Sequence, residues 1–146
     1  TGGANDSRSR AALRNTLQDK RFAELREGVW MRPANVEIDL GDKIAERVRV
    51  LRSRDDAPAE LATRLWDLTG WADAGREMLT AMTEAHDVPA RFAVAASMVR
   101  HLLTDPVLPD ELLPAGWPGA TLRAVYEDFA AELVARRDGV ELAEVR

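Results

Sequence analysis

The stretch Asp105-Pro-Val-Leu-Pro-Asp-Glu-Leu-Leu-Pro-Ala-Gly-Trp-Pro-Gly119 decides how the second half of this chain is built. It holds four prolines in fifteen residues, and each proline fixes its own backbone angle and keeps the preceding residue extended. The segment is therefore a stiff connector. Because its three leucines and Trp117 are too apolar for a solvated linker, we predict that it lies as a rigid clasp across neighbouring helices.

The sequence on both sides of this connector has the apolar periodicity of helices. An apolar stripe with alternating spacings of four and three residues predicts one long helix from about residue 58 to 82. A second helix is predicted over residues 87–104, and a third over residues 117–139. The side chains expected on the shared core face are Leu61, Leu65, Leu68, Ala72, Gly75, Leu79, Met82, Phe92, Ala95, Ala96, Val99, Leu102, Leu103, Leu122, Val125, Tyr126, Phe129, Ala130 and Leu133.

The first 55 residues have mixed patterning. A helix is predicted from Ser7, or from Asp6 as N-cap, to about Lys20, followed by a strand over 23–33 that is interrupted near Gly28. The predicted elements that follow are an extended piece over 36–40, a short helix over 41–47 and a strand over 48–54. The expected fold class is therefore α+β and mainly helical, with one domain over residues 1–55 and a helical domain over residues 56–146.

Composition limits the functional class. The chain has 146 residues, of which 46% are hydrophobic, so it can bury a core. It has no cysteine, no apolar run long enough for a membrane span and no signal peptide, so we expect a cytoplasmic protein. The net charge of -5 is uneven, because residues 1–54 carry a balance of +4 and the remainder carries -9. The basic part could attract phosphate groups, or it could be an ordinary solvated surface.

Four blocks of sequence carry a resemblance. Residues 28–33 read Gly-Val-Trp-Met-Arg-Pro after Phe22, and residues 65–68 read Leu-Trp-Asp-Leu. Residues 100–109 and 111–119 contain the proline-rich connector. In this order the blocks resemble the PaaX family of bacterial transcriptional repressors. The resemblance implies a homodimeric cytoplasmic repressor with an N-terminal winged helix for operator DNA, a central ferredoxin-like domain, a C-terminal helical domain and an acyl-coenzyme A inducer.

Compared with that family, this sequence begins late. The first predicted element is already the helix of the ferredoxin-like domain, so residues 1–55 are expected to be an incomplete ferredoxin-like part, and the winged helix is expected to be missing. The expected function is effector sensing and dimerisation in a PaaX-like repressor, with operator DNA bound only through the missing domain. The alternative is a pure dimerisation module without a small-molecule ligand.

Several side chains could contact an acyl-coenzyme A effector, although each has a structural alternative. Arginines could bind phosphates, and tryptophans could stack on an aromatic acyl group or on adenine, yet aromatic side chains are more often core. Arg100 and His101 could instead bind the carbonyls that end their helix. The candidate ligand-binding residues are Arg26, Trp30, Arg32, Arg100, His101 and Trp117.

No cofactor or metal is expected. His86 and His101 are the only histidines, and the pair His101 and Asp105 is separated by a helix end that Pro106 imposes. The sequence also contains no Gly-x-Ser-x-Gly motif and no nucleophile with an adjacent base, so we do not expect an enzyme.

Overall fold

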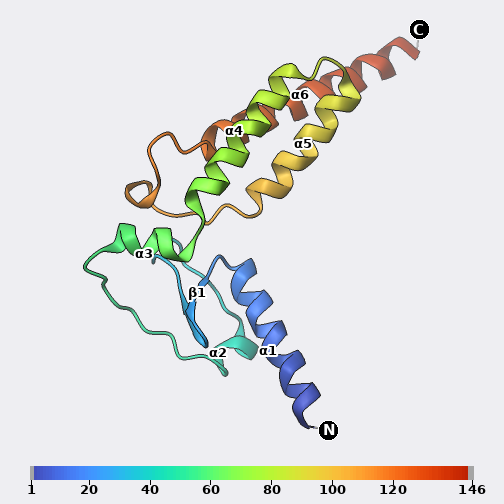
Figure 1. Cartoon of the computed structure of the whole chain (residues 1–146). Helices are drawn as coiled ribbons and strands as arrows, with labels where there is room; N and C mark the ends of the chain where they lie inside the picture. The colour runs from blue at the N-terminus through green and yellow to red at the C-terminus, as the bar shows by residue number, and fades with distance from the viewer. Residues whose placement is uncertain (1, 145–146) are drawn as a thin grey trace. The chain divides into compact units, whose positions relative to one another are not determined.

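The computed structural model describes residues 2–144, which form two compact units. The first unit contains the described residues up to Asp67 together with residues 106–113. The second contains residues 68–105 and the described residues from Pro114 onward. Helices dominate, and the described strands form a small antiparallel sheet, so the predicted α+β, mainly helical class is confirmed (Figure 1).

A long helix and a two-stranded hairpin open the first unit. Glu24 pairs with Trp30 across the hairpin, and Gly28 in the turn has a φ of 76°, a left-handed value that glycine adopts without a steric cost. The strand predicted over residues 23–33 is therefore two antiparallel strands that fold back at Gly28. The elements are α1 (Gly2–Asp19), β1 (Ala23–Arg26) and β2 (Val29–Met31).

Helix α1 contacts the hairpin through both apolar and charged groups. Leu17 is buried, and Arg14 Nη2 donates to Glu24 Oε2 at 2.9 Å. The Arg14 guanidinium also lies 5.9 Å from the Trp30 ring centroid. Because α1 begins at Gly2, the N-cap predicted at Asp6 or Ser7 is wrong.

The two extended pieces predicted after the hairpin do not form strands. Residues 36–40 and 48–54 have no ladder partner among the described residues, although the short helix predicted between them is present as α2 (Asp42–Ala45). Val50 is 67% exposed and Leu51 is 79% exposed. An alternating pattern permits an extended backbone, but a strand also needs a neighbouring strand to satisfy its N–H and C=O groups.

The central part of the predicted clasp belongs to the first unit. Helix α3 (Pro58–Leu65) packs against the 3-10 helix η1 (Asp110–Leu112), and Ala62 and Leu108 are both buried. Asn35 Nδ2 donates to the carbonyl of Val107 at 2.9 Å. The segment is held firmly, as predicted, and residues 106–113 group with the first unit.

The long helix predicted over residues 58–82 is broken. Helix α3 ends at Leu65, Trp66 is extended with φ -131° and ψ 140°, and α4 (Leu68–Glu84) begins two residues later. Asp67 stands directly before α4, and aspartate at that position favours a new helix start over continuation of the old one. An apolar stripe continues through the break, which is why periodicity alone predicted a single helix.

Three helices build the second unit. Asp87 Oδ1 accepts from the N–H of Ala90 at 2.7 Å and caps α5, so the predicted start of this helix is confirmed. Figure 1 shows α4, α5 and α6 side by side. The helices are α4, α5 (Val88–Leu102) and α6 (Gly119–Glu144), and their buried core cluster is Met82, Ala95, Met98, Leu122 and Phe129.

The face that α5 buries differs from the predicted one. Met98 is fully buried and was not among the predicted core residues, whereas Phe92 is 59% exposed and Leu103 is 62% exposed. The buried face of α5 is therefore centred on Ala95 and Met98, whereas the predicted face also included the exposed Phe92 and Leu103. The predicted end of the last helix at Asp138-Gly139 is also wrong, because α6 continues to Glu144.

An ion pair links α5 to α6 beside the core. Arg91 Nη1 lies 2.7 Å from Glu132 Oε2, and the Arg91 guanidinium lies 5.0 Å from the Phe129 ring centroid. Hydrogen bonds from Arg91 and then Arg136 lower the pKa of the Glu132 carboxyl group. This carboxylate therefore stays ionised to a lower pH than an isolated glutamate.

The contact units and the predicted domains divide the chain differently. Residues 58–65 pack with η1 in the first unit, whereas the helical domain was predicted to begin at residue 56. The predicted domain boundary between residues 55 and 56 remains a prediction. The ferredoxin-like assignment of residues 1–55 also remains a prediction. None of the helices within residues 2–144 is both long enough and apolar enough to cross a membrane.

Candidate functional site

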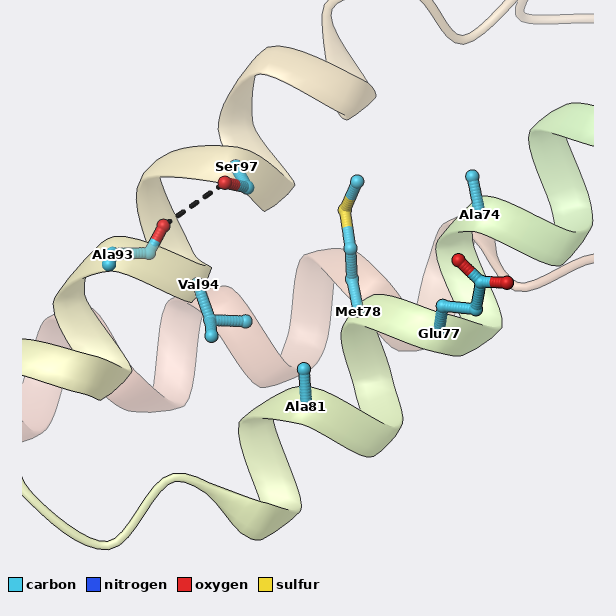
Figure 2. Close-up of a pocket in the computed structure, with 7 residues that line it drawn as sticks. All are labelled: Ala74, Glu77, Met78, Ala81, Ala93, Val94 and Ser97. Carbon is cyan, nitrogen blue, oxygen red and sulfur yellow. Dashed lines mark hydrogen bonds between the residues drawn. The ribbon is translucent and has the colours of Figure 1, made fainter.

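An open groove of about 420 Å³ runs between the outer faces of α4 and α5. Figure 2 shows Met78 and Val94 projecting between the two helices, with Glu77 on the α4 side and Ser97 on the α5 side. The lining is mostly apolar and small, so the groove can accept an apolar surface at close range. Its lining residues are Ala74, Glu77, Met78, Ala81, Ala93, Val94 and Ser97.

A stack of three aromatic rings lies elsewhere in the second unit. The Trp71 ring stacks on the Trp117 ring with centroids 4.4 Å apart and an interplanar angle of 10°. On its other side, the Trp71 ring stacks on the His101 ring at 4.2 Å and 21°. The stack joins α4, α5 and the segment that leads into α6, so it holds the three helices together at this end.

Hydrogen bonds fix the orientation of the stacked rings. His101 Nε2 donates to the carbonyl of Trp71 at 2.9 Å, because a carbonyl can only accept. The Trp71 indole N–H donates to Thr104 Oγ1 at 3.1 Å, and the Thr104 hydroxyl donates to the carbonyl of His101 at 2.7 Å. These bonds close a ring of contacts, so neither Trp71 nor His101 can turn without breaking at least one of them.

The side chain of Asp105 lies next to the first residue of α6, Gly119. It is 3% exposed, and its Oδ2 atom lies 3.0 Å from Arg123 Nη1. The same oxygen lies 3.2 Å from the position a Cβ would take at Gly119, the first residue of α6. A carboxylate beside a helix N-terminus is stabilised by the helix dipole, so Asp105 anchors the beginning of α6.

The second unit brings together two of the three predicted site residues it contains. His101 and Trp117 both stack on Trp71, and both are half-buried. Arg100 is exposed and donates to Ser97 Oγ at 2.9 Å. The Arg100 and His101 side chains bind Ser97 Oγ and the carbonyl of Trp71, and not the carbonyls that end α5. At that end, Thr104 Oγ1 donates to the carbonyl of His101.

The other three predicted site residues lie in the first unit. Arg26 ends β1 and is exposed, while Trp30 on β2 lies beneath Arg14. Arg32 donates to the carbonyls of Pro33 and Lys20 and to Asn35 Oδ1, with distances of 3.1, 3.0 and 3.2 Å. Its side chain therefore ties the loop after the hairpin to the end of α1.

Partial burial lowers the pKa of the Arg32 guanidinium, and the nearby positive charge of Arg21 contributes a smaller part. Its hydrogen bonds to two backbone carbonyls and one side-chain oxygen compensate for the lost water. Arg32 is thus engaged in the local structure, whereas the other candidate arginine of this unit, Arg26, is exposed.

Two features escaped the sequence reasoning. Trp71 is the centre of the aromatic stack, and the spacing of Trp71, His101 and Trp117 contains no signal that these rings meet. The groove was missed because its alanines carry little signal in a hydrophobic pattern. Among residues 7–138, whose side chains the structure describes, no group of three or more acidic or histidine side chains is arranged to hold a metal ion.

Residues 65–139 match the family described as PaaX-like protein C-terminal domain. Among solved structures, the chain is similar to the uncharacterized protein Rv0674 from Mycobacterium tuberculosis, at 61% sequence identity and a TM-score of 0.88. The match covers 92% of this chain and 57% of that one, so the chain spans little more than half of its relative. A comparison with curated proteins finds no match.

The family match covers just over half of the chain and includes α4, α5, the proline-rich connector and most of α6. It therefore includes the aromatic stack and every residue that lines the groove. The earlier resemblance is confirmed, and the chain belongs to the PaaX-like family of transcriptional regulators, whose C-terminal domain it contains.

Proposed function

We propose that this chain is the effector-sensing and dimer-forming region of a bacterial transcriptional repressor that acts in the cytoplasm. The observation that carries the proposal is the family match over residues 65–139, which includes the whole of α4 and α5 and most of α6. Operator DNA would be bound by a winged-helix part of the parent protein outside these 146 residues. The relative of known structure is considerably longer than this chain, which is compatible with such a part.

The proposed mechanism is a shift between two dimer geometries. An effector that binds one geometry more tightly than the other moves the population towards it, and the attached DNA-binding domains change their spacing. The proposed effector is an acyl-coenzyme A, which combines anionic phosphates with an apolar acyl group. No catalytic step belongs to this proposal, so the thioester leaves the protein unchanged.

The candidate contact residues differ in how exposed their side chains are and in how far these side chains are already bonded or stacked within the fold. Arg26 is exposed and can approach a phosphate, with the half-buried Trp30 on the neighbouring strand. Arg32, His101 and Trp117 already hold parts of the fold together through hydrogen bonds or stacking. Among the six predicted contacts, Arg26 is therefore the residue whose replacement should affect binding with the least effect on stability.

Calorimetric titration of the chain with phenylacetyl-coenzyme A should show saturable binding. Replacement of Arg26 by alanine should weaken it about tenfold, which corresponds to ~1.4 kcal/mol, because one charge-assisted phosphate contact is lost. Mass spectrometry after the titration should recover the intact thioester. Arg52→Ala removes an exposed arginine from the same unit and should leave the affinity unchanged.

The absence of binding heat with a panel of aromatic and aliphatic acyl-coenzyme A thioesters would favour the alternative function, a dimerisation module without a small molecule. One structural observation supports that alternative. His101 and Trp117, which were expected to contact the effector, are both stacked on Trp71 inside the second unit. Sedimentation analysis would then still show a dimer, although no thioester would change its stability.

A further inference from the structure

Opposite charges flank the groove between α4 and α5. Glu77 lies on the α4 side and is exposed. On the α5 side, Ser97 lines the groove, and its hydroxyl oxygen accepts from Arg100 Nη2 at 2.9 Å. The groove therefore has an acidic rim on one helix and a basic rim on the other.

The two charged groups lie on opposite sides of the same groove. Glu77 of α4 and Ser97 of α5 both line it, as Figure 2 shows. Arg100 reaches back along α5, so that its Nη2 atom lies 2.9 Å from Ser97 Oγ. The Arg100 guanidinium therefore lies beside Ser97, on the rim across the groove from Glu77.

This arrangement is complementary to itself. A two-fold axis that lies in the interface and runs along the groove turns a second copy to face the first and places the α4 rim of each copy opposite the α5 rim of the other, so Glu77 of each copy comes to face Arg100 of the other. Two equivalent ion pairs result from one symmetry operation, as an isologous interface requires. If both rims had the same charge, the same operation would bring like charges together.

The surface between the rims suits a close helix-to-helix contact. Ala74, Ala81 and Ala93 are small, so helices of a second copy could approach without obstruction, and Met78 and Val94 offer apolar area to cover. The geometry points to this groove as the surface through which two copies of the chain pair, with reciprocal Glu77–Arg100 ion pairs at its rims. This inference rests on the proposed function, because dimer formation is part of it.

Charge reversal tests the pairing directly. Glu77→Arg places arginine opposite Arg100 of the second copy, and Arg100→Glu places glutamate opposite Glu77. Each variant alone should dimerise at least about tenfold more weakly than the wild type in sedimentation equilibrium, since both rim contacts become repulsive. An equimolar mixture of the two variants should recover dimers, because every rim contact between unlike chains is attractive again. The double variant should also recover dimers.

Matched controls separate this surface from others. Glu127→Arg makes the same charge change on the exposed surface of α6 and should leave dimerisation unchanged. Phe92→Glu introduces a charge at an exposed apolar residue of α5 that does not line the groove, and it should also have no effect. Circular dichroism should show that all variants remain folded, because Glu77, Arg100, Phe92 and Glu127 are exposed.

Three outcomes would overturn the inference. If the wild type is a dimer that both single reversals leave intact, this groove is not the interface, although the proposed function survives. If Phe92→Glu dissociates the dimer and the rim variants do not, the dimer uses the other side of α5. If the wild type is a monomer at all concentrations tested, the interface and the dimer-forming part of the proposed function both fail, and the thioester titration still tests effector binding separately.

Discussion

Replacement of Trp117 by alanine is expected to lower the free energy of unfolding by about 3 kcal/mol, since a large aromatic contact is lost without a substitute. The Trp117 ring stacks on Trp71 at 4.4 Å. Its Nε1 atom also lies 2.7 Å from the position a Cβ would take at Gly119, so the indole covers the first residue of α6. Urea denaturation followed by circular dichroism measures the loss.

The conservative change Trp117→Phe serves as the control. A phenyl ring can still stack on Trp71, so this variant should recover most of the lost stability. A loss below about 0.5 kcal/mol for Trp117→Ala would contradict the role assigned to the stack, because that range is typical of surface substitutions. In that case the connector would be held in place only by the contacts that its residues 106–113 make within the first unit.

Helix boundaries near strong local signals were predictable. The start of α5 was predicted at residue 87, and in the structure the Asp87 side chain accepts from the N–H of Ala90. Its end was placed near Thr104 because of Pro106, and the helix ends at Leu102. Caps and prolines act within a few residues of their own position, so the sequence alone is enough to locate their effects.

Features that depend on distant partners were not predictable in the same way. Residues 48–54 have the alternation of a strand, yet Val50 and Leu51 are exposed and no described strand pairs with them. The stripe of the predicted long helix continued past Trp66, although the backbone breaks there. Periodicity reports which side chains could share a face, whereas pairing and breaks depend on the rest of the fold.

The candidate site shows the same division. The stiffness of the connector followed from its four prolines, and Trp117 is indeed packed instead of loose in solvent. The stack itself joins α4, α5 and the entry to α6, and only the assembled unit brings Trp71 between His101 and Trp117. The division of the connector between the two units also depends on contacts that lie far apart in sequence.

Gly75→Leu is expected to destabilise the second unit by about 3 kcal/mol or more, because the added side chain has no space at the contact between α4 and α6. A Cβ at this position would lie 2.9 Å from Leu122 Cδ1 and 3.0 Å from Pro118 Cγ. Leu122 is fully buried, and the proline ring is rigid, so neither can move away at low cost. Thermal and urea unfolding of the variant measure the effect.

Thr80→Leu on the same helix provides the matched control, because Thr80 is exposed and leucine favours helix formation. It should change stability by less than about 0.5 kcal/mol. The comparison separates crowding from any general effect of leucine on α4. Equal stability of Gly75→Leu and the wild type would mean that α4 and α6 can separate freely at this level. The aromatic stack, which spans the same helices nearby, could then not be the rigid support that the Trp117 prediction assumes.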